Sequence, residues 1–135
     1  MAQLFQWDQS KLSINVKEMD DEHKELVRLM NILFDQNDKK AAKAELSKSL
    51  KALFAYTIKH FADEEKYFSS LNYPKAAVHK RIHQDLLTRL TKFAEDFEKG
   101  SSPQISNEFF SFLKVWLTGH IMGVDKEYGA IAKDG

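Results

Sequence analysis

The sequence contains no cysteine, and it has only two prolines and five glycines among its 135 residues. Without cysteine the chain can form no disulfide bond, no thiolate zinc site, no iron–sulfur cluster and no cysteine nucleophile. Any bound metal must therefore be held by imidazole nitrogens and carboxylate oxygens. The scarcity of proline and glycine leaves long uninterrupted stretches, which favour helices over hairpins.

The sequence also lacks an excess of charge of either sign and a long hydrophobic run. Its 20 basic residues balance its 20 acidic residues, so we expect no overall attraction to nucleic acid or to an anionic membrane. No stretch approaches the length that spans a bilayer, and the first residues show no basic segment followed by an apolar run. We therefore expect a soluble cytoplasmic monomer that neither binds nucleic acid nor inserts into a membrane.

Apolar residues recur at helical spacing in four long stretches. After an extended N-terminal arm over residues 1–18, we expect helices at about 20–36, 41–69, 74–98 and 104–119, and a short C-terminal segment at about 121–132. Asp20 is the predicted cap of the first helix, and Pro74 marks the break between the second and the third. Long helices with short connections predict an all-α fold, an antiparallel up-down-up-down four-helix bundle that forms a single domain.

All five histidines fall on the predicted helices or, for His120, at the very end of one, and two of the helices carry a pair of polar residues one turn apart. His60 precedes Glu64 by four residues, and His79 precedes His83 by four, so each pair shares one helix face. In an up-and-down bundle, the early part of one helix lies beside the late part of the next. The sequence therefore predicts that five imidazoles and two carboxylates meet at one end, namely His23, His60, Glu64, His79, His83, His120 and Asp125.

The spacing of His120 and Asp125 does not fit a regular α-helix. Five residues turn an ideal helix by about 500°, which leaves the two side chains roughly 140° apart. To bring them together, the helix must widen locally or break near Gly123.

A single inward histidine is more often a hydrogen-bonded core residue than a metal ligand. A core that held all seven groups without a cation would leave several of them without hydrogen-bond partners. Each such group would destabilise the fold by about 1–3 kcal/mol. Seven ligands exceed the six positions of an octahedral ion, so two metal ions are expected. Five histidines divide as three and two, which leaves one metal with a free position. Imidazoles with bridging carboxylates suit iron, although manganese, zinc or cobalt fit the same ligands.

These residues, with the segments MDDEHKEL, NYP and WLTGHI, resemble the hemerythrins, and the likeness runs from Trp7 to about Tyr128. The resemblance implies a non-haem di-iron centre with a bridging oxo or hydroxo group that binds dioxygen reversibly. It implies that His79, His83 and His120 hold one iron, that His23 and His60 hold the other, and that Glu64 and Asp125 bridge both. The two-histidine iron is then the one that binds oxygen.

The resemblance also implies an apolar oxygen pocket. Its lining residues match Leu26, Phe61, Trp116, Leu117 and Ile121. One departure is Phe68, where the family often has methionine, and this difference bears on pocket packing rather than on metal ligation.

The leading hypothesis is thus a binding protein for oxygen transport, storage or delivery, not an enzyme. A di-iron oxidase or peroxidase is the second hypothesis, but such bundles usually carry Glu-x-x-His ligand pairs, and none occurs here. A sensor of oxygen or nitric oxide would need a separate output protein, and a zinc hydrolase would need a substrate cleft. A reductase or an oxygen-using protein is an expected partner.

Overall fold

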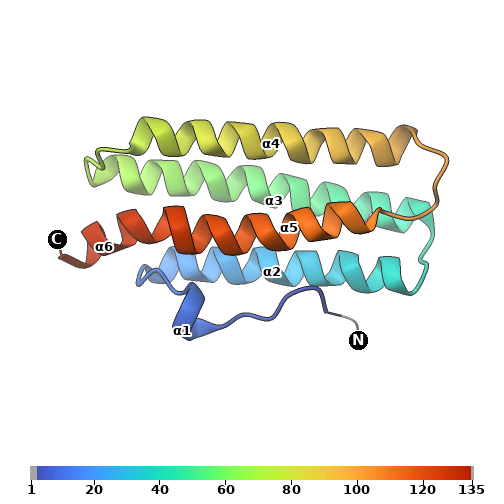
Figure 1. Cartoon of the computed structure of the whole chain (residues 1–135), viewed down its shortest axis with the longest axis horizontal. Coiled ribbons are helices and arrows are strands. Elements are labelled where there is room, and N and C mark those ends of the chain that lie inside the picture. The colour runs from blue at the N-terminus through green and yellow to red at the C-terminus, as the bar shows by residue number, and fades with distance from the viewer. Residues whose placement is uncertain (1–2, 135) are drawn as a thin grey trace.

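The computed structural model describes residues 3–134, with side chains described over residues 3–130. Four long helices run alternately up and down: α2 (Lys17–Asp38), α3 (Lys43–Ser70), α4 (Ala76–Lys99) and α5 (Asn107–His120). Figure 1 shows them side by side, with the turn from α3 to α4 at the same end of the bundle as the beginning of α2 and the end of α5. The predicted antiparallel four-helix bundle is confirmed.

The polypeptide does not break after α5. A π-helical turn, η1 (Ile121–Asp125), joins α5 directly to α6 (Lys126–Asp134), so the predicted C-terminal segment continues α5 rather than standing apart from it. The helix therefore widens locally near Gly123, which is the first of the two ways in which His120 and Asp125 were expected to converge.

The N-terminal arm is extended except for one short helix, α1 (Gln9–Leu12), that the sequence analysis missed. The Asp8 side chain caps this helix by accepting a hydrogen bond from the Ser10 backbone N–H. The amide of Asn31 on α2 fastens the earlier part of the arm, because it accepts from the backbone N–H groups of Leu4 and Phe5 and donates to the Phe5 carbonyl.

Asp20 does not cap α2, and this prediction was wrong. The helix begins one turn earlier, at Lys17, where Val16 is the N-cap without a side-chain hydrogen bond. The Asp20 carboxylate instead accepts hydrogen bonds from the Ser13 hydroxyl and the Ile14 N–H, and so ties the arm to the first turns of the helix.

The other helices begin slightly later than expected. Their first residues are Lys43, Ala76 and Asn107 rather than 41, 74 and 104. The start of α5 is set by Ser106, whose hydroxyl accepts from the backbone N–H of Phe109 in the manner of an N-cap. Pro74 lies in the turn before α4, so the helix starts beyond it.

The bundle encloses an apolar core along most of its length. Leu33, Leu46, Leu53 and Leu113 come from three different helices, and each is fully buried. No helix in the described part of the chain is long and apolar enough to cross a membrane. At one end of the bundle this apolar core gives way to buried histidines and carboxylates.

Candidate metal centre

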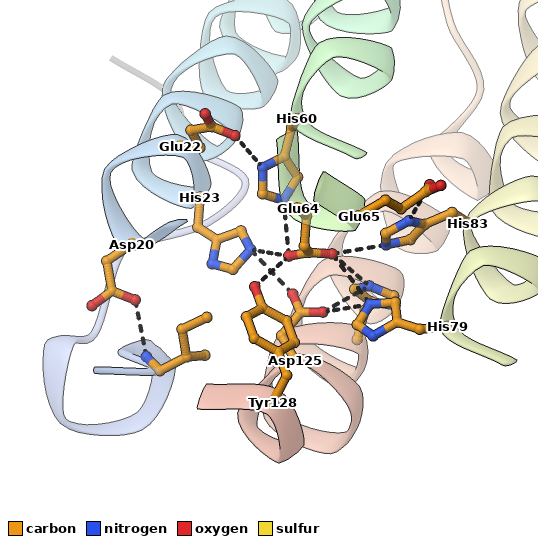
Figure 2. Close-up of polar contacts among 12 residues, drawn as sticks. Asp20, Glu22, His23, His60, Glu64, Glu65, His79, His83, Asp125 and Tyr128 are labelled. Atoms are coloured by element: carbon orange, nitrogen blue, oxygen red, sulfur yellow. Dashed lines mark hydrogen bonds and ion pairs between the residues drawn. The ribbon is translucent and has the colours of Figure 1, made fainter. Parts of the chain in front are cut away.

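Seven buried polar side chains from five helical elements meet at that end of the bundle. His23 comes from α2, His60 and Glu64 from α3, His79 and His83 from α4, His120 from the end of α5, and Asp125 from η1. Figure 2 shows Glu64 and Asp125 in the middle, with His23 and His60 on one side and His79 and His83 on the other. The structure thus brings together all seven residues that the sequence singled out.

These residues form two overlapping sets, and in each set one potential ligand atom from every residue lies within 4.8 Å of those of the others. One set holds three histidines, His79, His83 and His120, and the other holds two, His23 and His60. Glu64 and Asp125 belong to both sets. The division of five imidazoles into three and two, with two shared carboxylates, is the arrangement that two neighbouring metal ions require.

Each carboxylate turns one oxygen toward each set. Glu64 Oε2 lies 3.5 Å from His23 Nε2 and 3.4 Å from His60 Nε2, whereas Glu64 Oε1 lies 3.2 Å from His79 Nε2 and 2.8 Å from His83 Nε2. Asp125 Oδ2 lies 3.1 Å from His23 Nε2.

The other oxygen of Asp125, Oδ1, lies 3.0 Å from both His79 Nε2 and His120 Nε2. Both side chains therefore have the geometry of bridging groups.

Several of these atoms are buried without hydrogen-bond geometry, although their distances are short. They are His23 Nε2, His83 Nε2, His120 Nε2 and both carboxylate oxygens of Asp125. Their lone pairs and ring protons converge on a common space instead of pairing in the directions that hydrogen bonds need. Buried polar groups that point together in this way fit metal ligation, because a cation at the focus satisfies them all at once.

The electrostatics of the site demand positive charge beside the two carboxylates. Burial alone would lower the pKa of His60, but its hydrogen bonds to Glu22 and Glu64 outweigh burial and raise the pKa to about 9. Burial likewise opposes charge on His120, yet the negative charge of Asp125 raises its pKa to about 10.

Burial would raise the pKa of Glu64, but the surrounding histidines hold it well below its ordinary value. The carboxylates therefore stay ionised, and their charge must be met by protons on the imidazoles or by cations that displace those protons.

The π-helical turn is what brings Asp125 into the site. A π-helix needs more residues per turn than an α-helix, so a five-residue step from His120 returns to nearly the same face. Asp125 Oδ1 consequently lies 3.0 Å from His120 Nε2. The unusual spacing noted in the sequence is thus resolved by backbone geometry.

The five residues predicted to line an oxygen pocket are all buried: Leu26, Phe61, Trp116, Leu117 and Ile121. The Phe61 ring stacks on His83 with a centroid distance of 3.9 Å and meets the Trp116 ring edge-on at 5.9 Å. Trp116 in turn lies 6.4 Å from the His120 ring. The aromatic members therefore border the histidines directly, and the Trp116 indole Nε1 has no hydrogen-bond partner among the described residues.

Phe68 packs on the three-histidine side of the site. Its ring lies 4.6 Å from His79 and 5.7 Å from Tyr128, and it is fully buried. Its larger side chain is thus accommodated beside His79.

The sequence analysis missed three further residues around the site. Glu22 and Glu65 accept hydrogen bonds from the Nδ1–H groups of His60 and His83, and the Tyr128 hydroxyl donates to Glu64 Oε2 at 2.8 Å. Tyr128 follows Asp125 by three residues, so helical spacing could have revealed it. The two glutamates carry no such signal, because in sequence they look like members of solvated charged faces.

The chain matches the family model of the hemerythrin HHE cation binding domain over residues 15–132. The chain belongs to the hemerythrin family. It is 30% identical to a bacteriohemerythrin of Stenotrophomonas maltophilia over 125 aligned residues. The alignment covers 93% of this chain and 79% of that protein. It is 31% identical to a bacteriohemerythrin of Methylococcus capsulatus over 126 residues, and this alignment covers 93% of this chain and 95% of that protein.

The fold of this hemerythrin-family chain is similarly close to solved members. A crystal structure of wild-type hemerythrin superposes with a TM-score of 0.87 at 30% sequence identity, covering 95% of this chain and 97% of the other. The family's cation-binding description agrees with a buried set of imidazoles and carboxylates at one end of the bundle.

Proposed function

We propose that this protein binds dioxygen reversibly at a di-iron centre. The observation that carries the proposal is the orientation of Glu64 and Asp125, since each carboxylate presents one oxygen to the two-histidine set and one to the three-histidine set. When bound, the pair of ferrous ions supplies the electrons that let dioxygen bind and leave. A bridging oxo or hydroxo group completes the expected cofactor.

The proposed ligand roles follow the two sets of converging atoms. His79, His83 and His120 hold one iron, His23 and His60 hold the other, and Glu64 with Asp125 bridge them. Because the set with His23 and His60 offers fewer protein ligands, it would leave a free position for dioxygen on the iron that it holds. The buried side chains of Leu26, Phe61, Trp116, Leu117 and Ile121 would keep water out of this end of the bundle.

The donor set favours a carrier over an enzyme. Imidazoles outnumber carboxylates five to two in the donor set, and no Glu-x-x-His pair is present in the sequence. We further propose that residues 1–135 act as one cytoplasmic domain, that it works as a monomer, and that a reductase or an oxygen-using protein is its partner. The site itself gives no support to a hydrolase, because its groups are buried under aromatic side chains.

Optical spectroscopy with metal analysis tests this proposal directly. Protein reconstituted anaerobically with ferrous iron should take up two irons per chain, one for each set of ligand atoms. Exposure to oxygen should produce absorption bands that disappear when oxygen is removed. A stable content of one iron, or bands that never reverse, would refute the proposal.

A pair of variants tests which iron binds oxygen. Replacing His23 by alanine removes one of the two imidazoles on the open side and should abolish the reversible bands. The exposed Lys92→Ala variant is the control and should keep them. Intact oxygen binding in the His23→Ala protein would contradict the assignment of the open position.

A further inference from the structure

Two carboxylates that do not belong to the seven converging groups form hydrogen bonds with the Nδ1 atoms of two of the imidazoles. Glu22 Oε1 lies 2.7 Å from His60 Nδ1, and Glu65 Oε2 lies 3.0 Å from His83 Nδ1 (Figure 2). Both histidine side chains are 1% exposed, whereas those of Glu22 and Glu65 are 16% and 29% exposed. The two glutamates thus connect the buried site with the surface of the bundle.

These hydrogen bonds determine which ring nitrogen keeps its proton. An ionised carboxylate can only accept, so the Nδ1 atoms of His60 and His83 must donate. The lone pair of each neutral ring is then on Nε2, the atom that lies 3.4 Å (His60) or 2.8 Å (His83) from Glu64. Each ring is thereby held with its metal-binding nitrogen directed into the site before any metal arrives.

The two contacts are divided between the two metal sets. His60 belongs to the two-histidine set and His83 to the three-histidine set. By contrast, the Nδ1 atoms of His23 and His79 are buried and have no hydrogen-bond partner among the described residues. One imidazole of each set therefore has a carboxylate behind it.

The surroundings of the two glutamates differ. Lys59 Nζ lies 3.7 Å from Glu22 Oε2, so a cation stands beside the carboxylate behind His60, although the nearer partner of Lys59 is Asp63 Oδ2 at 2.7 Å. Among the described side chains, no lysine or arginine forms an ion pair with Glu65. The carboxylate behind His60 therefore has a cation within 4.0 Å, and the described residues place no such cation beside the carboxylate behind His83.

We propose that Glu22 and Glu65 are positioning residues that preset His60 and His83 for metal binding, and that Lys59 selectively weakens this effect on the two-histidine side. The inference rests on the proposed ligand roles. A carboxylate hydrogen-bonded to a ligating imidazole fixes the ring and makes it a stronger donor. A stronger donor favours the more highly charged ferric state, and the positive charge of Lys59 opposes that preference at the oxygen-binding iron.

Cobalt(II) titration of the metal-free protein tests the positioning role without any oxygen chemistry. Glu22→Ala and Glu65→Ala should each weaken binding at one of the two sites by about 10–100-fold. Glu22→Gln should restore most of the affinity, because its amide oxygen still accepts from His60 Nδ1–H. Glu25→Ala is a matched control on the same helix and should bind cobalt like the parent.

Nitrogen-15 NMR of the metal-free protein gives an independent readout. At a pH above the His60 pKa of about 9, the parent should show the single ring proton of His60 on Nδ1, and Glu22→Ala should change this signature for His60 alone. Unchanged cobalt affinity and an unchanged His60 signature in Glu22→Ala would overturn the positioning role.

The role of Lys59 is tested by the reduction potential of the iron-loaded protein. Lys59→Met should lower the potential and hasten oxidation in air, whereas Glu22→Gln should raise it. Lys48→Met, an exposed site on the same helix, should leave it at the parent value. Equal potentials in the parent, Lys59→Met and Glu22→Gln would overturn the inference.

The two levels of the argument fail in different ways. If the parent protein does not take up two metal ions, the proposed function is wrong. If the parent takes up two and the variants of Glu22, Glu65 and Lys59 match it, only the present inference is wrong.

Discussion

Glu64 has more partners in the site than any other residue described. Its two oxygens lie within 4.0 Å of the Nε2 atoms of all five histidines, and Oε2 also accepts a hydrogen bond from Tyr128. Burial raises the pKa of Tyr128, which therefore keeps the proton that it donates. The hydrogen bond from the Tyr128 hydroxyl helps to hold Glu64 in the orientation in which one oxygen faces each histidine set.

Replacing Glu64 by alanine should reduce iron binding more than replacing any single histidine. The substitution removes a bridge between the two metals and also a negative charge that compensates both cations. Iron content after anaerobic reconstitution is the measurement, with exposed Glu45→Ala as the control. Iron retention equal to that of the His23→Ala protein would count against a bridging role.

Leu117 offers a test of water exclusion by a single apolar side chain. It is 1% exposed and follows Trp116 on the helix that carries His120. Leu117→Ala should hasten oxidation to the inactive diferric form with little loss of iron, because solvent reaches the oxygen site.

Leu117→Ala should also lower the free energy of unfolding by about 2–5 kcal/mol, as large-to-small core substitutions do. The volume-conserving Leu117→Met is the matched variant and should oxidise at nearly the parent rate. If Leu117 is only a core residue, the alanine variant melts lower yet oxidises at the parent rate well below its melting temperature.

At the scale of elements, the π-helical turn η1 accommodates one more residue between His120 and Asp125 than a regular α-helical turn would. In an α-helix, the residue that shares a face with His120 is four positions away, whereas Asp125 is five away. The widened turn absorbs the extra residue and leaves Asp125 and the following Tyr128 facing the site. Gly123 lies within this turn, and a Cβ added there would meet no neighbouring atom.

Deleting Gly123 should convert the turn to regular α-helix and preserve metal binding. Asp125 would then follow His120 by four residues, which in an α-helix again share a face. Circular dichroism and metal titration should both resemble those of the parent. A loss of both metals would show that the π-helical geometry itself, and not the facing of the two side chains, is required.

Deletion of Gly119 is the matched control for that experiment. Gly119 is also free of contacts at its Cβ position, but it lies in α5 one residue before His120. Its removal turns His120 by about 100° relative to the preceding helix. This variant should bind less metal than the Gly123 deletion, and the reverse order would contradict the role assigned to the turn.

At the scale of the whole molecule, the bundle concentrates its buried charge at one end. Five helical elements supply the seven converging groups, while most of the other buried side chains are apolar. Metal ions at this end would link α2, α3, α4, α5 and η1 to one another. Since an unfolded chain does not preform such a site, the free energy of metal binding adds to the stability of the fold.

Removal of metal should therefore lower the melting temperature. Protein loaded with cobalt(II) or anaerobic iron should melt higher than the same protein after chelation, and readdition of metal should reverse the change. The Glu64→Ala protein should show a much smaller difference between the two conditions. Equal melting temperatures for loaded and chelated parent protein would contradict the linkage.

The sequence by itself determined the fold class and the group of residues that converge. Apolar periodicity and the scarcity of breakers specified four helices, because helical spacing is a local property. The alternation of helix direction then placed His23, the His60–Glu64 pair and the His79–His83 pair at one end. The resemblance to the hemerythrins, which the family comparison confirmed, added the expected cofactor.

Only the tertiary structure decided how the groups face one another. Whether a widened turn or a break reconciles His120 with Asp125 depends on backbone hydrogen bonding in η1, which periodicity does not specify. Asp20 became a tether for the arm because Ser13 and Ile14 fold back onto it. The contacts of Glu22 with His60 and of Glu65 with His83 join different helices, and such contacts depend on helix rotation and packing, which no local pattern of residues records.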